Sequence, residues 1–177
     1  AIHPDNPQDR LIKQAADIVR SGGVIVYPTD SCYALGCKLG DKNAMERILT
    51  IRKIDQKHHL TLMCADLSEL GTYAKVDNAQ FRQLKAATPG SYTFILQATK
   101  EVPNRTLHPK RKTIGLRVPD NATALALLQE LGEPILSCTL MLPEDEEPLT
   151  DPYEMSMLSI WLSMAAGAVL SRQRLLI

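Results

Sequence analysis

Four apolar residues between glycine and proline constrain the fold of this 177-residue chain more than any other feature. Residues 24–27 read Val-Ile-Val-Tyr, an unbroken and largely β-branched run that follows Gly22-Gly23 and precedes Pro28. A run of this kind predicts a strand that is buried on both of its faces. The rest of the chain must therefore supply layers that cover such a strand.

The residues before this strand predict a helix. Asn6 followed by Pro7 is typical of an N-cap and a first helical position, and apolar residues recur with the helical period over residues 11–19. Ser21-Gly22-Gly23 is expected to end the helix. A helix that leads into a buried strand favours an α/β domain.

Further helices and strands alternate along the chain. The expected strands are apolar runs at residues 60–64, 92–98, 113–118 and 135–141. The expected helices begin at the capping residues Asp41, Asp77 and Asn121. The strands between residues 90 and 118 are candidates for antiparallel pairing. This alternation predicts one α/β domain with a twisted, open, mixed sheet.

Composition is that of an ordinary globular domain, with 45% hydrophobic and 23% charged residues, which excludes a wholly disordered chain. The 20 basic and 20 acidic side chains cancel, so the total charge offers no argument for nucleic-acid binding. Their distribution is uneven, because residues 143–154 hold six acids and no base. The rest of the chain is mildly basic, and a basic functional face remains open.

Cysteine usage and hydropathy bear on the compartment. The four cysteines form no C-x-x-C pair and no His cluster accompanies them, so we expect buried thiols rather than a metal site. The first residues show no signal-peptide pattern. Residues 155–170 carry no charge, but a membrane span needs about 20 apolar residues, so we expect a buried or interfacial helix. These features predict a cytoplasmic protein without membrane association.

A polar segment follows the first strand. Residues 27–37, which leave the end of this strand, carry five hydroxyl or carboxylate side chains among small residues. Ligands of open α/β sheets bind beyond the carboxyl ends of strands, so the segment predicts contacts to a small polar ligand. An ordinary polar turn is the alternative. The segment matches no Walker or G-x-G-x-x-G motif, so cationic side chains must hold any nucleotide phosphates.

Two basic clusters are candidates to supply such cations. The first ends the second expected helix and consists of Arg52, Lys53 and Lys57. Basic residues at that position also complement the helix dipole, which is the alternative role. The second surrounds a proline-containing loop and consists of Lys100, Arg105, Lys110, Arg111 and Lys112. It is either a solvated loop or a contact for a nucleic-acid backbone.

Three further polar residues lie within expected strands. Arg117 stands in an apolar context, where an unpaired charge is costly, so we expect it to contact an anionic partner or ligand. Ser137 and Thr139 alternate along a strand, which places both hydroxyls on one face. Ordinary strand hydroxyls with satisfied hydrogen bonds are the alternative.

Five short motifs follow one another along the chain: P-T-D-S-x-Y-A-L-G-C, a basic helix end, P-G-S-Y-T-F-I-L, G-L-R-V-P and S-x-T. In this order they resemble the YrdC/YciO-like family, and its YciO branch most of all, over roughly residues 2–153. The resemblance implies a single YrdC-like α/β domain with a twisted open mixed sheet, helices and a large concave basic cavity. It also implies binding of double-stranded RNA or tRNA.

The resemblance implies an activity as well. Well-known members make threonylcarbamoyl-AMP from L-threonine, bicarbonate and ATP for the threonylcarbamoyladenosine modification of tRNA, with Mg²⁺ held mainly by the ATP phosphates. The implied catalytic residues are Arg52, Lys53 and Arg117. The implied substrate and nucleotide contacts are Thr29, Thr61, Thr93, Ser137 and Thr139. The expected RNA contacts are Lys57, Arg105, Lys110, Arg111 and Lys112.

Departures from the family pattern affect the expected activity. The K-x-R motif of the synthases reads Arg52-Lys53-Ile54 here, and Thr139 stands in place of the Asn of S-x-N. Losing one preorganised donor or cation at a developing charge costs about 3–4 kcal/mol, so we expect weak synthase activity or none. Residues 155–177 lack the usual family ending. They are expected to form an atypical tail, frameshifted or truncated, after a domain spanning residues 1–154.

Three functions remain open from the sequence alone. The first is an RNA-binding YrdC-like protein with weak or no synthase activity, either monomeric or weakly self-associating through its apolar tail. The second is a functional threonylcarbamoyl-AMP synthase. The third is an enzyme that uses another amine or carboxylic acid with ATP. A steep fall of RNA affinity with salt distinguishes the first.

Overall fold

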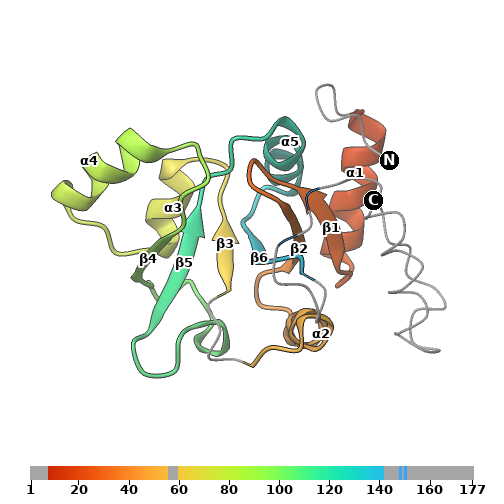
Figure 1. Ribbon diagram of the computed structural model, residues 1–177, viewed down its shortest axis with the longest axis horizontal. Coiled ribbons are helices and arrows are strands. Elements are labelled where there is room, and N and C mark those ends of the chain that lie inside the picture. Colours follow the sequence, from red (N-terminus) through yellow and green to blue (C-terminus); the bar gives the residue numbers. More distant parts are fainter. Residues whose placement is uncertain (1–7, 56–59, 142–147, 149, 151–177) are drawn as a thin grey trace.

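An open six-stranded sheet organises the described part of the chain (Figure 1). The computed structural model describes residues 8–55, 60–141, 148 and 150. The strands are β1 (Ile25–Pro28), β2 (Tyr33–Lys38), β3 (Thr61–Met63), β4 (Phe94–Gln97), β5 (Thr113–Arg117) and β6 (Ile135–Thr139). They lie in the order β1-β2-β6-β3-β5-β4. Strands β3 and β5 are parallel and all other neighbours are antiparallel, which confirms the predicted open mixed sheet and the antiparallel β4–β5 pair.

Five α-helices and one short 3-10 helix lie within the described residues. They are α1 (Asp9–Arg20), α2 (Lys42–Arg52), α3 (Leu67–Tyr73), α4 (Asn78–Ala87), η1 (Asn104–Thr106) and α5 (Ala122–Leu131). The side chains of Asp41, Asp77 and Asn121 accept hydrogen bonds from backbone amides of the first turns of α2, α4 and α5. All three predicted N-caps are therefore confirmed.

The helices cover both faces of the sheet. On one face α1 and α5 pack together, and Val19 and Leu128 meet Ile25 and Ile135 of the strands in a buried cluster. On the other face, helix residues such as Ile48 of α2 belong to a second and larger cluster. The sheet is thus the middle layer, and strand residues alternate between two apolar cores.

The structure corrects three expectations. Helix α1 begins at Asp9 with Gln8 as its N-cap, rather than at Asn6 and Pro7, which lie outside the described residues. Only residues 29–32 of the polar segment that was expected to run as far as Cys37 form a turn. Strand β2 begins directly after them, at Tyr33. Helix α3 follows a capping aspartate, Asp66, that the sequence reading passed over.

The strand predicted from the apolar run at residues 24–27 is present as β1, but it forms an edge of the sheet. Residues 25–27 are buried although β1 pairs only with β2 among the described strands. Ile25 and Tyr27 belong to the core cluster on the α1 and α5 side, whereas Val26 belongs to the other cluster. Cover on both faces of β1 explains the apolar run.

Several expectations concern residues that the structure leaves undescribed. Lys57, the acidic residues 143–147 and the expected tail from residue 155 all lie outside the described residues. Three of the four cysteines are buried and Cys32 is half-buried, and all four are free thiols. Within the described ranges, no helix combines the length and the apolar character that a membrane crossing requires.

Candidate functional site

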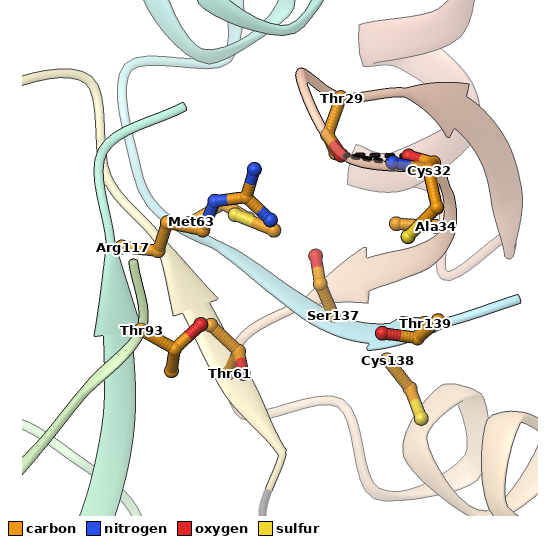
Figure 2. A pocket seen from close by; sticks show the side chains of 10 residues that line it. All are labelled: Thr29, Cys32, Ala34, Thr61, Met63, Thr93, Arg117, Ser137, Cys138 and Thr139. Atoms are coloured by element: carbon orange, nitrogen blue, oxygen red, sulfur yellow. Dashed lines mark hydrogen bonds between the residues drawn. The ribbon is translucent and has the colours of Figure 1, made fainter. Parts of the chain in front are cut away.

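A small polar pocket lies where the strand ends approach the turn at residues 29–32 (Figure 2). It has a volume of about 40 Å³. The residues that line it are Thr29, Cys32, Ala34, Thr61, Met63, Thr93, Arg117, Ser137, Cys138 and Thr139. Arg117 is the only charged side chain among the described residues of this lining. The pocket is thus a ring of hydroxyls and small side chains around one guanidinium group.

The register of the sheet explains why the hydroxyls meet. Thr61 of β3 pairs with Ser137 of β6 on one side and with Gly115 of β5 on the other. Thr139 pairs with Ala34 of β2. Ser137 and Thr139 are two residues apart on β6, so their side chains point to the same face of the sheet. Both line the pocket, which confirms the prediction that they share a face.

Gly115 leaves room for two of the threonines. A Cβ atom at this position would lie 3.0 Å from Cγ2 of Thr93 and 3.1 Å from Oγ1 of Thr61. Both distances are tighter than ordinary van der Waals contact, so any larger residue must displace the hydroxyl-bearing side chains. A glycine inside an apolar strand run is the signal that points to such a close approach.

Tyr27, the first residue of the predicted polar segment, forms part of the floor of the site. Its hydroxyl lies 2.5 Å from Oγ of Ser137, and both side chains are buried. Burial raises the pKa of Tyr27, so the phenol stays neutral. A Cβ atom at Gly36 would lie 2.8 Å from Cε1 of Tyr27, so this glycine lets the ring lie against β2.

Arg117 has protein partners at all three of its nitrogen atoms. Nε donates to the carbonyl of Gly90 at 3.1 Å, Nη1 donates to Oγ of Ser31 at 2.9 Å, and Nη2 forms an ion pair with Asp30. The Arg117 side chain is 6% exposed and that of Asp30 is 15% exposed. The prediction that Arg117 needs an anionic partner is confirmed, and the partner is a carboxylate of the chain itself.

Arg52 lies beside the pocket rather than in it. Its Nε donates to Sγ of Cys138 at 3.4 Å, and its Nη1 donates to the carbonyl of Met141 at 3.3 Å. The guanidinium therefore reaches the end of β6 from the α2 side of the sheet. Lys53, the C-cap of α2, is exposed and has a left-handed backbone with φ of 51°. Neither residue is brought together with Arg117, and their predicted catalytic roles stay predictions.

The second basic cluster lies on the connection between β4 and β5, residues 98–112, which we call the basic loop. Arg105 donates a hydrogen bond to the carbonyl of Gly40, just before α2. A second cavity of about 420 Å³ runs along this loop, and Lys100 and Lys112 are among the residues that line it. The exposed basic side chains of the loop are Lys100, Arg105, Lys110, Arg111 and Lys112.

The basic loop is separate from the hydroxyl pocket. It joins the start of β5 at Thr113, whereas Arg117 ends that strand. The large concave basic cavity implied by the family resemblance is therefore not confirmed, because the pocket is small and its one cation is paired with Asp30.

Fold and pocket together define an α/β domain with a small polar pocket on one face of its sheet. Residues 17–159 match the model of the Sua5/yciO/yrdC family, which is described as "Telomere recombination". The chain belongs to this Sua5/YciO/YrdC family.

Related sequences fall into two groups. The chain is 67% identical over 153 residues to the YciO protein of Escherichia coli strain K12, an alignment that covers 86% of this chain and 74% of that protein. It is 36% identical over 135 residues to the threonylcarbamoyl-AMP synthase of Chromobacterium violaceum, covering 76% of this chain and 69% of the synthase. Both comparisons confirm the family resemblance.

Solved structures agree with the fold. The crystal structure of E. coli YciO matches with a TM-score of 0.85 and 65% identity, over 89% of this chain and 76% of that one. The crystal structure of P. abyssi Sua5 complexed with L-threonine matches with a TM-score of 0.71 and 26% identity, over 76% of this chain and 39% of that one. The predicted YrdC-like α/β domain is confirmed.

Proposed function

We propose that the pocket binds L-threonine and that the chain forms threonylcarbamoyl-AMP from it slowly, with ATP and bicarbonate. The observation that carries this proposal is Arg117, a buried guanidinium inside a ring of hydroxyls. The planar fork of arginine matches a carboxylate in two parallel hydrogen bonds. The relative named threonylcarbamoyl-AMP synthase and the L-threonine complex of P. abyssi Sua5 support this choice of amino acid.

The pocket residues fall into natural roles for an amino acid. Arg117 takes the α-carboxylate. The hydroxyls of Thr61, Thr93 and Ser137 are both donors and acceptors, which suits the amine and the side-chain hydroxyl of threonine. Thr29, on the opposite wall, contacts the bound amino acid and encloses it in the site.

The proposed reaction needs positioning more than covalent help from the protein. The amine of threonine combines with bicarbonate to give a carbamate and water. A carbamate oxygen then bonds to the α-phosphorus of ATP, while the bond from that phosphorus to the bridging oxygen breaks and pyrophosphate leaves with the electron pair. Orientation of the reactants and neutralisation of phosphate charge carry most of such catalysis.

We assign neutralisation of that charge to Arg52, whose contact with Cys138, a lining residue, supports this role although Arg52 itself lies beside the pocket. Within the described residues, no three His, Cys, Asp or Glu side chains come together as a metal site. An accompanying Mg²⁺ ion would be held by the ATP phosphates, the arrangement this ion commonly adopts.

Two features make the proposed rate low. Ile54 stands where the synthases have the second cation of their K-x-R motif. Its side chain is partly buried and packs against the larger core, so it carries no charge to the phosphates. Thr139 offers one hydroxyl with a single donor hydrogen, where the synthases have a carboxamide with a separate acceptor oxygen and a two-donor NH₂ group. Each missing group at a developing charge costs about 3–4 kcal/mol in the transition state.

The direct test is release of pyrophosphate from ATP by the purified protein in the presence of L-threonine and bicarbonate. We expect slow release that needs all three substrates and that Arg52→Ala abolishes. Arg82→Ala removes an exposed arginine on α4 and serves as the matched control. Release that is independent of L-threonine, or equal in the Arg52→Ala and Arg82→Ala proteins, contradicts the proposal.

Double-stranded RNA or tRNA is a second proposed partner, and the basic loop favours it. Its five exposed cations are opposed within the loop by one acid, Glu101. Phosphate contacts release counterions, so RNA affinity should fall steeply with salt, with a slope that shrinks by about 0.9 for each contact removed. We expect the triple variant of Lys110, Arg111 and Lys112 to alanine to flatten the salt dependence, whereas Arg82→Ala leaves it unchanged. An unchanged slope in the triple variant excludes the loop as an RNA contact.

A further inference from the structure

Asp30 and Ser31 already contact both terminal nitrogens of Arg117. The two terminal nitrogens, Nη1 and Nη2, are the pair that grips a carboxylate in a fork geometry. In this structure Nη1 donates to Ser31 and Nη2 is paired with Asp30. Each terminal nitrogen keeps one further N–H, but the carboxylate of Asp30 already lies against the fork that the carboxylate of the proposed substrate needs.

Asp30 and Ser31 belong to a compact unit, the 29–32 turn between β1 and β2. The amide of Thr29 donates to the carbonyl of Cys32 at 3.0 Å, and the Thr29 hydroxyl donates to the same carbonyl at 2.6 Å. The Thr29 hydroxyl also accepts from the amide of Cys32 at 3.2 Å. These bonds stay within the turn, so the turn can move away from Arg117 without breaking them.

The size of the pocket requires such a movement. A volume of about 40 Å³ has room for a few water molecules, whereas pockets for small ligands measure about 300–1,000 Å³. Thr29 and Cys32 both line the pocket. Displacement of the 29–32 turn therefore enlarges the same space that its contact with Arg117 now closes.

We propose that the 29–32 turn is a latch, in which Asp30 holds Arg117 until the carboxylate of an amino acid replaces it and frees the turn. This inference rests on the proposed binding of an amino acid at Arg117. It makes Asp30 a specificity-determining residue, because a ligand must carry a negative charge to compete with it.

Charge explains why the ligand replaces Asp30 rather than joining it. Arg117 is the only charged side chain among the described lining residues, and Asp30 already balances it. A second carboxylate beside Asp30 would place two negative charges on one guanidinium in a partly buried site, which is unfavourable. Asp30 as a whole residue is exposed at the tip of the hairpin, so its released carboxylate passes directly into water.

Asp30→Asn tests the latch, because it keeps the shape and one acceptor oxygen but removes the charge that competes with the ligand. Charge-assisted hydrogen bonds are about twice as strong as neutral ones, so we expect L-threonine to bind about tenfold more tightly to this variant by calorimetric titration. Asp30→Glu keeps the charge and should bind close to the wild-type value. Asp17→Asn is the matched control, since Asp17 pairs with Arg20 on the exposed surface of α1.

The outcomes separate the latch from the proposed function. Tighter binding in Asp30→Asn alone supports the latch. Wild-type binding with equal or weaker binding in Asp30→Asn overturns the latch but leaves the amino-acid site intact, and weaker binding identifies Asp30 as an anchor for the ligand's ammonium group. Absence of L-threonine binding to wild type and variant alike overturns both. If Asp30→Asn fails to fold, Ser31→Ala loosens the same contact, and unchanged affinity in that folded variant also overturns the latch.

Discussion

Asp30 and Arg117 lie 87 residues apart in the chain and form an ion pair with side chains that are 15% and 6% exposed. The pair connects the tip of the β1–β2 hairpin to the end of β5. Between these two elements lie the strands that supply Thr61 and Ser137. One interaction thus satisfies a buried charge and closes the pocket.

Removal of Arg117 should destabilise the fold. Arg117→Ala leaves Asp30 without its cation, and breaking a buried pair from one side costs about 3–5 kcal/mol, near the lower end here because the turn borders solvent. The double variant Arg117→Ala with Asp30→Ala should recover part of this loss. Urea unfolding of the two single variants and the double variant measures the coupling. Additive losses would show that the pair contributes nothing to stability.

Gly115 should not tolerate a methyl group. In Gly115→Ala the new Cβ presses on Thr61 and Thr93, and overpacking of this kind costs about 1–3 kcal/mol. Gly71→Ala is the control, because Gly71 lies in α3 with nothing within 4 Å of its added Cβ, and alanine there should stabilise by about 0.5–1 kcal/mol. Thermal unfolding compares the two, and equal shifts would contradict the close approach at Gly115.

The buried hydrogen bond between Tyr27 and Ser137 should respond unequally to loss of either partner. In Tyr27→Phe the Ser137 hydroxyl keeps a bond of 3.3 Å to the carbonyl of Ile135, so the loss should be about 0.5–1.5 kcal/mol. Ser137→Ala strands the Tyr27 hydroxyl in the core and should cost about 1–3 kcal/mol. Denaturant unfolding ranks the two variants, and the opposite ranking would disprove this assignment of partners.

Stability should fall above pH 9. Burial, with a further contribution from Asp41, raises the pKa of Cys37 from 9.0 to about 12. The unfolded thiol ionises first, so the stabilisation is complete below pH 9 and is lost as the pH rises toward 12. Cys37 accounts for about 1.4 kcal/mol of the loss between pH 8 and pH 10. In Cys37→Ala the fall over this interval should be smaller by that amount, and an identical fall would refute the assignment.

Local features of the fold were predictable from sequence because each depends on a few neighbouring residues. The N-caps at Asp41, Asp77 and Asn121 need only a side chain and the amides that follow it. Strand β2 escaped prediction because the polar turn before it masks where the strand begins. Helix α3 spans only seven residues, too few to show a clear apolar period.

The pocket was predictable in part. The hydroxyl residues expected from the family motifs do line it, namely Thr29, Thr61, Thr93, Ser137 and Thr139. The need of Arg117 for an anion follows from its apolar strand. Its choice of Asp30 does not, because that depends on how the β1–β2 turn is placed over the sheet. Arg52 was predicted to be catalytic, but its contacts with Cys138 and Met141 hold it beside the pocket rather than in its lining.

Binding of an amino acid in the pocket depends most on recognition of its carboxylate by Arg117. Calorimetric titration of the wild-type protein with L-threonine, and separately with L-threoninamide, tests this directly. The amide keeps the amine and the hydroxyl but lacks the negative charge, so L-threonine should bind and L-threoninamide should bind at least tenfold more weakly, about 1.4 kcal/mol. Equal affinity for the two ligands would contradict the central claim, since the pocket would then recognise threonine without using Arg117.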